Sequence, residues 1–303
     1  MTILDGKTLA GEVNQRVQQE VEELKARTGK IPGLTVVIVG SDPASQIYVR
    51  GKNKTAAKLG IESNVLELDA SISAQELLDT ITRLNNDDSV HGILVQMPLP
   101  DHLDEWQILD HIDPAKDVDR FHPVNLGMLT LKRTDIFPCT PAGILELLDH
   151  YKIDLTGMHA VVLGRSFIVG KPIAGMLTNR NATVTLCHSR TKNLPSMLKT
   201  ADLIVAAIGK AGYVTPDMVK EGAVLVDVGI NRLDKKEDVL ALCNETQIKR
   251  FEKKGYGITG DIHKDAFAKS SFYTPVPGGI GAMTIAMLMH NTLRLFKNQL
   301  NID

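Results

Sequence analysis

Apolar residues in the first third of the chain form short runs that alternate with amphipathic stretches. Three runs rich in Val, Ile and Leu predict strands at 33–40, 63–69 and 90–98. The amphipathic stretches predict helices at 44–59 and 73–86. The second helix opens with Ser73 and has Glu76 three residues later, the pattern of a capping box. This alternation predicts parallel strands joined by right-handed crossovers.

A second series of apolar runs begins at residue 159. Its members predict five more strands, at 159–164, 182–187, 201–209, 223–229 and 256–262. These runs are almost continuously apolar, which is typical of a doubly wound parallel sheet covered on both faces. Further helices are expected at 141–151 and 282–299. Residues 113–141 hold four prolines and little periodicity, which indicates a crossing between domains that also carries part of a site.

Composition and charge narrow the class of protein. Of the 303 residues, 43% are apolar and 23% charged, as in soluble globular proteins. The 34 Lys and Arg against 36 Asp and Glu give a net charge of −2, which does not support a nucleic-acid or membrane partner. The three cysteines form no C-x-x-C pair, and no signal peptide or membrane span is evident. We therefore expect a cytoplasmic protein with reduced thiols.

A glycine loop follows the run at 159–164 and reads VVLGRSFIVGKP over 161–172. It matches neither the triphosphatase loop G-x-x-x-x-G-K-[ST] nor the dinucleotide fingerprint G-x-G-x-x-G. Its place between a strand and a helix is nevertheless that of a dinucleotide site, with Gly164 in a tight turn and Gly170 at the close approach of helix and strand. A free helix N-terminus here favours an anion. The alternative is an ordinary strand–helix turn.

The next predicted strand indicates which dinucleotide the loop would hold. An NAD site needs a carboxylate about 20 residues further on, but this strand ends in CHSRT, with Ser189 and Arg190 at that place. A hydroxyl and a guanidinium bind a 2′-phosphate that a carboxylate would repel. Arg165 adds a second positive charge. NADP is therefore favoured over NAD, unless Arg190 is only a solvated surface charge.

Chemistry-bearing residues also lie in the first half of the chain. Tyr48 and Lys52 are four residues apart and share a helix face, although such pairs are common on helix surfaces. Gln96 ends an apolar strand, where open α/β sheets bind ligands. The stretch KDVDRFHP (116–123) contains two aspartates, and a carboxylate can form paired hydrogen bonds with the edge of an amino-pyrimidine ring. A metal held by Asp117, Asp119 and His122 is the rival interpretation, but the spacing matches no standard metal pattern.

Nine stretches of the chain match, in order, the motifs of a known family. They are YVRGK (48–52), VHGILVQMPLP (90–100), KDVD (116–119), CTPAGI (139–144), GRSFIVGKP (164–172), CHSRT (187–191), DVGIN (227–231), GD (260–261) and YTPVPGGIG (273–281). Through them the chain resembles, over nearly its full length, the bifunctional methylenetetrahydrofolate dehydrogenase/methenyltetrahydrofolate cyclohydrolase family.

The resemblance implies two reactions of one-carbon metabolism. NADP⁺ takes a hydride from 5,10-methylenetetrahydrofolate, and water opens the resulting methenyl cation to 10-formyltetrahydrofolate, without a metal. Lys52 is then the central cyclohydrolase residue, Tyr48 packs on the folate, Gln96 hydrogen-bonds with Lys52, and Asp119 holds the pterin edge. The residues matching the NADP site are Gly164, Arg165, Ser166, Ser189, Arg190 and, through its backbone, Ile230. The turn matching the one beside the folate comprises Pro277, Gly278 and Gly279.

The resemblance also implies an α/β fold of two domains with a cleft between them. We expect an N-terminal α/β folate-binding domain at 1–120 and 282–303. A Rossmann-type doubly wound parallel sheet for NADP is expected at 121–281, along with a homodimer through that domain. Two rival interpretations are a two-domain NADP dehydrogenase of the shikimate or amino-acid type and a folate-binding protein without turnover.

Three local features of the matching motifs carry expectations of their own. The family usually has Gly after the second Asp of DVD, where this chain has Arg120, and Pro where this chain has Ala282. Arg120 brings a charge next to the pterin carboxylate and is expected to pair with an aspartate there. In the last motif, Val276-Pro277 is favoured over Thr274-Pro275 as a cis peptide bond.

Overall fold

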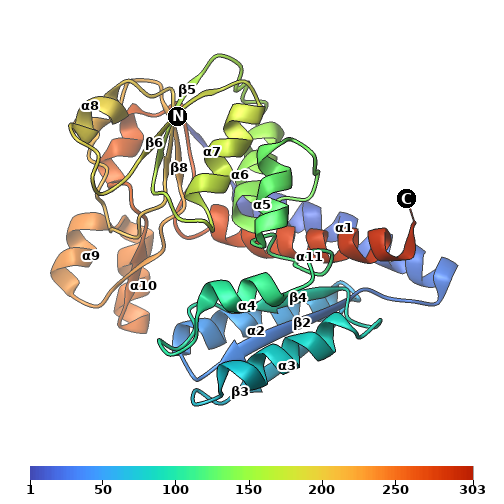
Figure 1. Ribbon diagram of the computed structural model, residues 1–303. Helices are drawn as coiled ribbons and strands as arrows, with labels where there is room; N and C mark the ends of the chain where they lie inside the picture. Colours follow the sequence, from blue (N-terminus) through green and yellow to red (C-terminus); the bar gives the residue numbers. More distant parts are fainter. Residues whose placement is uncertain (303) are drawn as a thin grey trace. The chain divides into compact units, whose positions relative to one another are not determined.

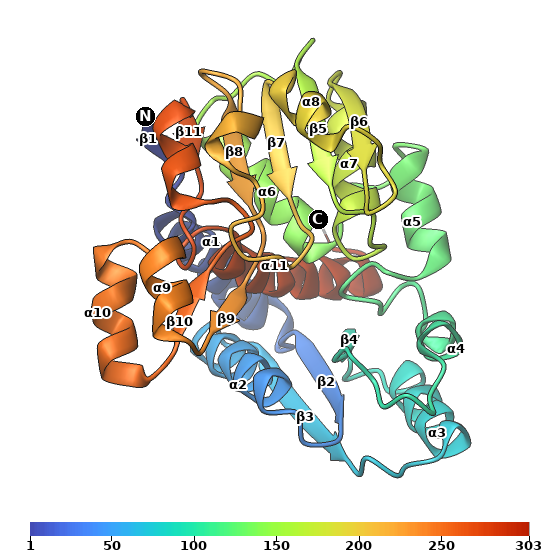
Figure 2. The ribbon, with the colours of Figure 1, turned by 90° about the vertical axis from the view of Figure 1, so that its left-hand side faces the viewer.

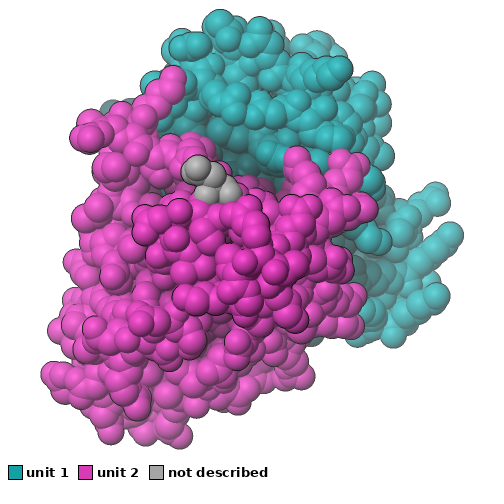
Figure 3. Space-filling model, turned by 90° about the vertical axis from the view of Figure 1, so that its right-hand side faces the viewer, with its two compact units in different colours: residues 1–9, 140–284 teal, residues 10–139, 285–303 magenta. Residues whose placement is uncertain are grey.

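The computed structural model describes residues 1–302, except for the side chains of residues 43 and 44. The chain divides into two compact units (Figure 3). Unit 1 comprises Met1–Leu9 and Thr140–Thr284, and unit 2 comprises Ala10–Cys139 and Ile285–Asp303. The divisions fall inside the two longest helices, α1 (Gly6–Thr28) and α11 (Ile280–Leu300), and at the start of α6 (Cys139–His150).

These bounds differ from the expected ones at residues 1–9, 121–139 and 282–284. Residues 121–139 lie in unit 2, because Asn291 Nδ2 on α11 donates to the carbonyls of Val118 (3.1 Å) and Phe137 (2.9 Å). Met1–Leu9 lies in unit 1, because β1 (Thr2–Ile3) is the edge strand of that unit's sheet. Neither long-range contact has a signal in the local sequence pattern.

Unit 2 is built on a three-stranded parallel sheet in the order β3-β2-β4. The strands are β2 (Gly33–Val39), β3 (Glu62–Leu68) and β4 (Gly92–Val95), which confirms the three predicted strands. All seven residues of β2 are buried, so both of its faces are covered. Three shorter helices lie beside this sheet in Figure 1: α2 (Pro43–Lys58), α3 (Ala74–Asn85) and α4 (Glu105–His111). The capping box of α3, between Ser73 and Glu76, is also confirmed.

The two long helices lie side by side within unit 2 (Figures 1 and 2), where Lys297 Nζ of α11 is 2.5 Å from Glu20 Oε1 of α1. The helix expected at 282–299 is α11, and α1 is not among the predicted elements. Among the described residues, no helix is long and apolar enough to cross a membrane.

Unit 1 is built on a six-stranded sheet in the order β1-β11-β8-β7-β5-β6, whose strand pairs are all parallel. The four longest strands of this sheet are β5 (His159–Leu163), β6 (Thr183–Cys187), β7 (Leu203–Ala206) and β8 (Val224–Asp227). β11 (Phe272–Tyr273) lies between β8 and β1. The chain leaves β5 toward β6 on one side and returns to β7 on the other, so the carboxyl end of β5 is a topological switch point.

The core of this sheet confirms the doubly wound prediction. Val161, Leu163 and Ile204 form one face with Leu194 and Leu198 of α8 (Leu194–Lys199). Residues of opposite orientation on the same strands, Val162 and Val205, are also fully buried, so the other face is covered as well. Helix α7 (Gly170–Asn179) connects β5 to β6.

One expected strand of unit 1 lies elsewhere. The run at 256–262 was expected in the large sheet, but β10 (Gly257–Thr259) pairs with β9 (Asn231–Leu233) in a separate two-stranded antiparallel sheet. Gly257 of β10 lies against Val239 of α9 (Lys236–Leu242), where a Cβ would come within 2.8 Å of that side chain. Val239 forms a small apolar cluster with Leu233 of β9 and with residues of α10 (Glu245–Lys254). These helices, together with α4 and α5 (Pro123–Thr130), are not among the predicted elements.

Candidate functional site

The first group of functional side chains starts on α2, whose N-terminus is capped by Asp42 through the N–H of Ser45 at 2.7 Å. Tyr48 and Lys52 lie one turn apart on this helix, as their spacing predicts, with Lys52 Nζ 5.6 Å from the centroid of the Tyr48 ring. Lys52 is only 7% exposed. A buried lysine needs a polar partner for its ammonium group.

Gln96 provides that partner. It follows β4 directly, and its own N–H donates to Val37 O at 2.8 Å, which extends the ladder by one residue. Its side-chain Nε2 donates to Met97 O at 2.7 Å, and this bond turns Oε1 toward Lys52, which donates to it at 3.0 Å. The structure therefore brings Tyr48, Lys52 and Gln96 together, although 44 residues separate the last two.

Asp119 belongs to the same part of unit 2. Burial raises the pKa of its carboxyl, and the positive charge of Lys52 acts against that rise. The thiol of Cys139 donates to Asp119 Oδ1 at 3.5 Å. Burial raises the pKa of Cys139 well above its usual value, so the thiol stays protonated and remains a donor. Lys52 therefore interacts with each of the other three residues expected to act on the folate, which are Tyr48, Gln96 and Asp119.

The neighbours of Asp119 in the KDVD motif have structural roles. Asp117 Oδ2 accepts from the N–H of His122 and from Asn125 Nδ2, both at 2.8 Å. His122 Nδ1 in turn accepts from the N–H of Val124 at 3.1 Å and caps α5. Asp117 and His122 thus build the turn into α5, whereas Asp119 is directed to Cys139 and Lys52.

Lys116, at the start of this motif, holds the end of α3. It is 7% exposed, and its Nζ donates to the carbonyls of Leu84 (3.2 Å) and Asp87 (2.7 Å). Burial lowers the pKa of Lys116. Cations near the last carbonyls of a helix are stabilising because those groups lack partners within the helix.

We expect Lys116→Met to lower the free energy of unfolding by roughly 1–3 kcal/mol, because the buried Leu84 carbonyl and the partly buried Asp87 carbonyl lose a charged donor. Urea denaturation followed by circular dichroism measures the change. Lys25→Met, at an exposed position on α1, is the matched control and should change stability by no more than about 0.5 kcal/mol. Equal stability of the two variants would show that Lys116 does not stabilise the helix end.

The glycine loop of unit 1 has the conformation that its sequence predicts. Gly164 has a φ of +118°, and a Cβ there would lie 2.2 Å from Ala207 O. A Cβ on Gly170 would lie 2.0 Å from Gly164 O, so both positions require glycine. Ser166 closes the loop, since its carbonyl accepts from Lys171 N at 2.9 Å and its Oγ accepts from Val169 N at 3.2 Å. At these two glycines the loop therefore packs closely against other backbone.

A pocket of about 330 Å³ lies beside the loop. Three of the expected cofactor residues line it: Gly164, Arg165 and Ser189. Lys210 and Tyr213 also line it, with Lys210 Nζ 5.8 Å from the Tyr213 ring, and the sequence pattern had not singled out either. Its arginine and lysine residues give the pocket a positive charge, which suits a phosphorylated ligand.

Three of the expected cofactor residues, Ser166, Arg190 and Ile230, lie outside that lining. The N–H of Arg190 donates to His188 Nδ1 at 3.1 Å, and its side chain is exposed. Ile230 is 53% exposed on the segment between β8 and β9. Ile230 belongs to the DVGIN motif, and the aspartate of the GD motif accepts a hydrogen bond from the next residue, Asn231, so these two motifs hold this segment.

Asp261, the carboxylate of the GD motif, is fully buried. It accepts four hydrogen bonds: from Ile208 N (2.7 Å) and Gly209 N (3.0 Å) on Oδ2, and from Lys210 N (2.8 Å) and Asn231 Nδ2 (2.9 Å) on Oδ1. One side chain therefore fixes the 208–210 wall of the pocket and the residue after Ile230. The sequence indicated this motif only through the resemblance and gave no role to its aspartate.

Asp227 holds Asp261 in turn. Its carboxylate accepts from the N–H groups of Gly229 (3.0 Å), Asp261 (2.8 Å) and Ile262 (2.8 Å). A Cβ on Gly260 would lie 2.0 Å from Asp227 Oδ2, which explains the glycine of GD. Burial raises the pKa of Asp227 to about 7 despite these donors. The two aspartates are thus positioning residues for the loops around the cofactor pocket.

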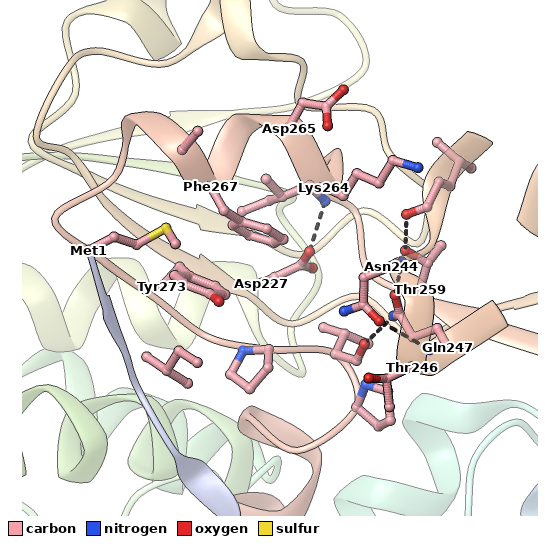
Figure 4. Close-up of a pocket in the computed structure, with 18 of the residues that line it drawn as sticks. Met1, Asp227, Asn244, Thr246, Gln247, Thr259, Lys264, Asp265, Phe267 and Tyr273 are labelled. Atoms are coloured by element: carbon pink, nitrogen blue, oxygen red, sulfur yellow. Dashed lines mark hydrogen bonds between the residues drawn. The ribbon is translucent and has the colours of Figure 1, made fainter. Parts of the chain in front are cut away.

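The segment 274–279 of unit 1 turns sharply. Val276-Pro277 is cis, as favoured from the sequence, and Met97-Pro98 in unit 2 is a second cis bond that the sequence analysis did not predict. The N–H of Lys7 donates to Gly278 O at 2.9 Å. Pro277 also lines a second pocket, of about 540 Å³, whose wall includes the stacked rings of Phe267 and Tyr273 (Figure 4).

Comparison with known proteins agrees with this geometry. The model of the tetrahydrofolate dehydrogenase/cyclohydrolase catalytic domain matches residues 4–119, and the model of the NAD(P)-binding domain of the same family matches 138–300. The chain belongs to the tetrahydrofolate dehydrogenase/cyclohydrolase family.

Individual relatives cover its full length. The bifunctional protein FolD of Chlorobium limicola is 50% identical, with 100% of each chain aligned, and that of Bacillus licheniformis is 47% identical over 99% of each. A crystal structure of bifunctional FolD from Campylobacter jejuni has a TM-score of 0.90 at 46% identity and covers 98% of this chain and 99% of its own. The Trypanosoma brucei enzyme, complexed with NADP cofactor and inhibitor, has a TM-score of 0.90 at 36% identity, with 99% and 98% covered.

The family glycine that Arg120 replaces has a conformational reason. Arg120 has a φ of +62°, the left-handed region that glycine enters without strain. Its guanidinium is buried, donates to Pro114 O at 2.9 Å, and is attracted by the charges of Asp117 and Asp135. The side chain therefore supports the turn before α5. The structure gives no account of Ala282 beyond its place in the first turn of α11.

Proposed function

We propose that this chain oxidises 5,10-methylenetetrahydrofolate with NADP⁺ and hydrolyses the methenyl product to 10-formyltetrahydrofolate, with Lys52 as the catalytic residue of the hydrolysis. The observation that carries the proposal is the buried Lys52 ammonium, held by Gln96 beside Tyr48 and Asp119. Relatives that align over the full length are named as bifunctional.

The residues of unit 1 fit a bound NADP. Gly164 and Gly170 leave the backbone open to a diphosphate, and Arg165 and Ser189 line the adjoining pocket with a positive charge and a hydroxyl. Ile230, which is 53% exposed, offers its backbone for a further contact. Ser166 shapes the loop, and Arg190 extends from the same turn as Ser189 toward a 2′-phosphate. When bound, NADP⁺ supplies the acceptor for the hydride that leaves the methylene bridge.

The hydration step needs a proton acceptor close to the attacking water. Lys52 can serve only as the free amine, and a positive methenyl group next to it favours that form by like-charge repulsion. Gln96 accepts a hydrogen bond from Lys52 and thereby fixes the direction of its lone pair or third N–H. Asp119 binds the amino-pyrimidine edge of the pterin, and the Tyr48 ring packs on the folate.

The turn that contains Pro277, Gly278 and Gly279 contributes backbone to the folate site. Gly278 has a φ of +111°, and a Cβ on Gly279 would lie 2.7 Å from Pro275 O, so both positions need glycine. At these two glycines no side chain shields the backbone N–H and C=O groups from a planar ligand.

Dehydrogenase assays with NADP⁺ and with NAD⁺ test the cofactor assignment. We expect Arg190→Ala to weaken NADP⁺ binding by roughly 1–3 kcal/mol, the range of a charged hydrogen bond, and to leave NAD⁺ nearly unaffected. Lys192→Ala, two residues further on and also exposed, should change neither value. An equal loss for both cofactors would show that Arg190 makes no contact with the 2′-phosphate.

Two copies of the chain are further proposed to pair through the NADP-binding unit, and the protein to act in the cytoplasm. The resemblance to a homodimeric family supports the first, and three free, buried cysteines suit a reducing compartment. Light scattering after size-exclusion chromatography tests the dimer against a single chain of 33.1 kDa.

A further inference from the structure

Gln247 occupies a junction that the two proposed reactions do not explain. It is the third residue of α10, and it forms a capping box with Asn244: its N–H donates to Asn244 Oδ1 at 3.0 Å, and Asn244 N donates to its Oε1 at 2.7 Å. A capping box needs only the oxygen of this side chain. The amide nitrogen is therefore available for other bonds.

That nitrogen bonds to two carbonyls outside the helix. Gln247 Nε2 donates to Ile258 O on β10 at 2.9 Å and to Val276 O at 2.6 Å. Figure 4 shows Asn244 and Gln247 together at the wall of the 540 Å³ pocket, with dashed lines marking their bonds. One side chain thus joins the start of α10, strand β10 and the turn at 276–279.

The segment that carries Gln247, comprising α9 and α10, is itself held in place by hydrogen bonds and apolar packing. Lys264 Nζ donates to the carbonyls of Leu240 (3.0 Å) and Cys243 (3.1 Å), at the end of α9. Val239 and Cys243 are buried in a small apolar cluster with Phe251 of α10. A hydrogen bond from a fixed element restricts the group that it reaches, because that group would have to give up the bond to move.

The turn is held from a second direction as well. Leu4 N donates to Tyr273 O at 2.8 Å, and Lys7 N donates to Gly278 O at 2.9 Å. The first bond lies before the turn and the second lies near its end, whereas Val276 O lies at its start. Gln247 therefore fixes the part of the turn that the N-terminal segment does not reach.

We propose that Gln247 is a positioning residue for folate binding, because it holds the Val276 carbonyl and with it the backbone of Pro277, Gly278 and Gly279. The inference rests on the proposed function, which places this turn beside the folate. The segment that contains α9 and α10 thereby contributes to substrate affinity, although Gln247 itself touches no reacting atom.

Two single substitutions separate the hydrogen bond from Gln247 to Val276 O from the capping box. Gln247→Glu keeps an oxygen for Asn244 N, but it removes both N–H donors and sets a carboxylate against the Val276 carbonyl. Asn244→Ala removes the cap on Gln247 N and leaves the Gln247 amide free to hold Val276. Gln247→Glu therefore removes the hydrogen bond to Val276 O and keeps the capping box, whereas Asn244→Ala weakens the capping box and keeps that hydrogen bond.

Cyclohydrolase activity is measured directly with 5,10-methenyltetrahydrofolate, so that the cofactor plays no part. We expect Gln247→Glu to raise the KM for this substrate by roughly 3- to 30-fold, as expected for one or two lost hydrogen bonds, with kcat and the KM for NADP⁺ within about twofold of wild type. Asn244→Ala should leave all of these constants within about twofold. Gln247→Met, which removes the donors without adding a charge, should shift the KM in the same direction if the glutamate variant folds poorly.

An unchanged KM in both Gln247 variants would overturn the proposal, as would an equal rise in Asn244→Ala. A fall in kcat and a rise in both KM values together would mean that Gln247 only stabilises unit 1, which also contradicts it. Absence of both activities in the wild-type protein would instead refute the proposed function, so the two failures are distinguishable.

Discussion

Lys52→Met is expected to lose nearly all cyclohydrolase activity while it retains a measurable fraction of the dehydrogenase. Methionine has similar length and fills the same buried space, but it cannot exchange a proton or donate to Gln96. A positioned proton-transfer group is typically worth about 10²–10⁴-fold in rate. Hydride transfer requires mainly that the two bound molecules be oriented. The two activities should therefore separate by at least about one order of magnitude, and methenyl product should accumulate.

Lys54→Met is the matched control, because this lysine lies on the same helix but is exposed. It should leave both activities close to wild type. If Lys52→Met stays folded, still binds folate and loses both activities by the same factor, Lys52 positions substrate for both steps and is not the acid–base group.

Asp261→Asn is expected to give the largest loss of stability among the substitutions considered. The carboxylate accepts four hydrogen bonds, two on each oxygen, from the 208–210 loop and Asn231. An amide turns one of these oxygens into an NH₂ group that faces two donors. Each buried donor left unsatisfied costs about 1–3 kcal/mol, so we expect a loss of roughly 2–5 kcal/mol in unfolding free energy.

The same substitution should weaken NADP⁺ binding, because the 208–210 loop is a wall of the cofactor pocket. Thermal unfolding with and without NADP⁺ measures both effects. Asp265→Asn, an exposed carboxylate four residues further on, should remain within about 0.5 kcal/mol of wild type. Wild-type stability and NADP⁺ affinity in Asp261→Asn would contradict the role assigned to the buried aspartates.

The elements that sequence could predict are those whose residues determine them locally. The strands at 33–40, 159–164 and 223–229 are buried on both faces, and a continuous apolar run expresses that environment directly. The Ser73 capping box involves residues three apart, and Gly170 is required by its contact with Gly164 within one strand–loop–helix segment. Each of these signals is complete within about a dozen residues.

The features that sequence could not predict depend on partners far along the chain. β10 has the composition of a core strand, but its hydrogen bonds go to β9 and not to the large sheet. The N-terminal residues read as the start of the first domain, yet β1 pairs with β11 about 270 residues later. Asp261 is a single carboxylate in the sequence, and only the structure shows that its oxygens collect donors from two separate loops.

The catalytic group shows both cases. The four-residue spacing of Tyr48 and Lys52 predicted a shared helix face, and the structure confirms it. The contact between Lys52 and Gln96 followed only from the resemblance to a known family, because no local pattern relates α2 to the residue after β4. Lys210 and Tyr213 were missed, since a lone lysine and tyrosine in a loop resemble ordinary surface residues until the pocket brings them beside Arg165.

The central claim is that one chain carries out both reactions, and a single time course tests it most directly. Wild-type protein is mixed with 5,10-methylenetetrahydrofolate and NADP⁺, and NADPH, methenyltetrahydrofolate and 10-formyltetrahydrofolate are followed together. We predict that 10-formyltetrahydrofolate forms in step with NADPH while methenyltetrahydrofolate stays low and decays much faster than in buffer alone. NADPH formation with methenyltetrahydrofolate that decays only at the buffer rate, or no NADPH formation at all, would contradict the account.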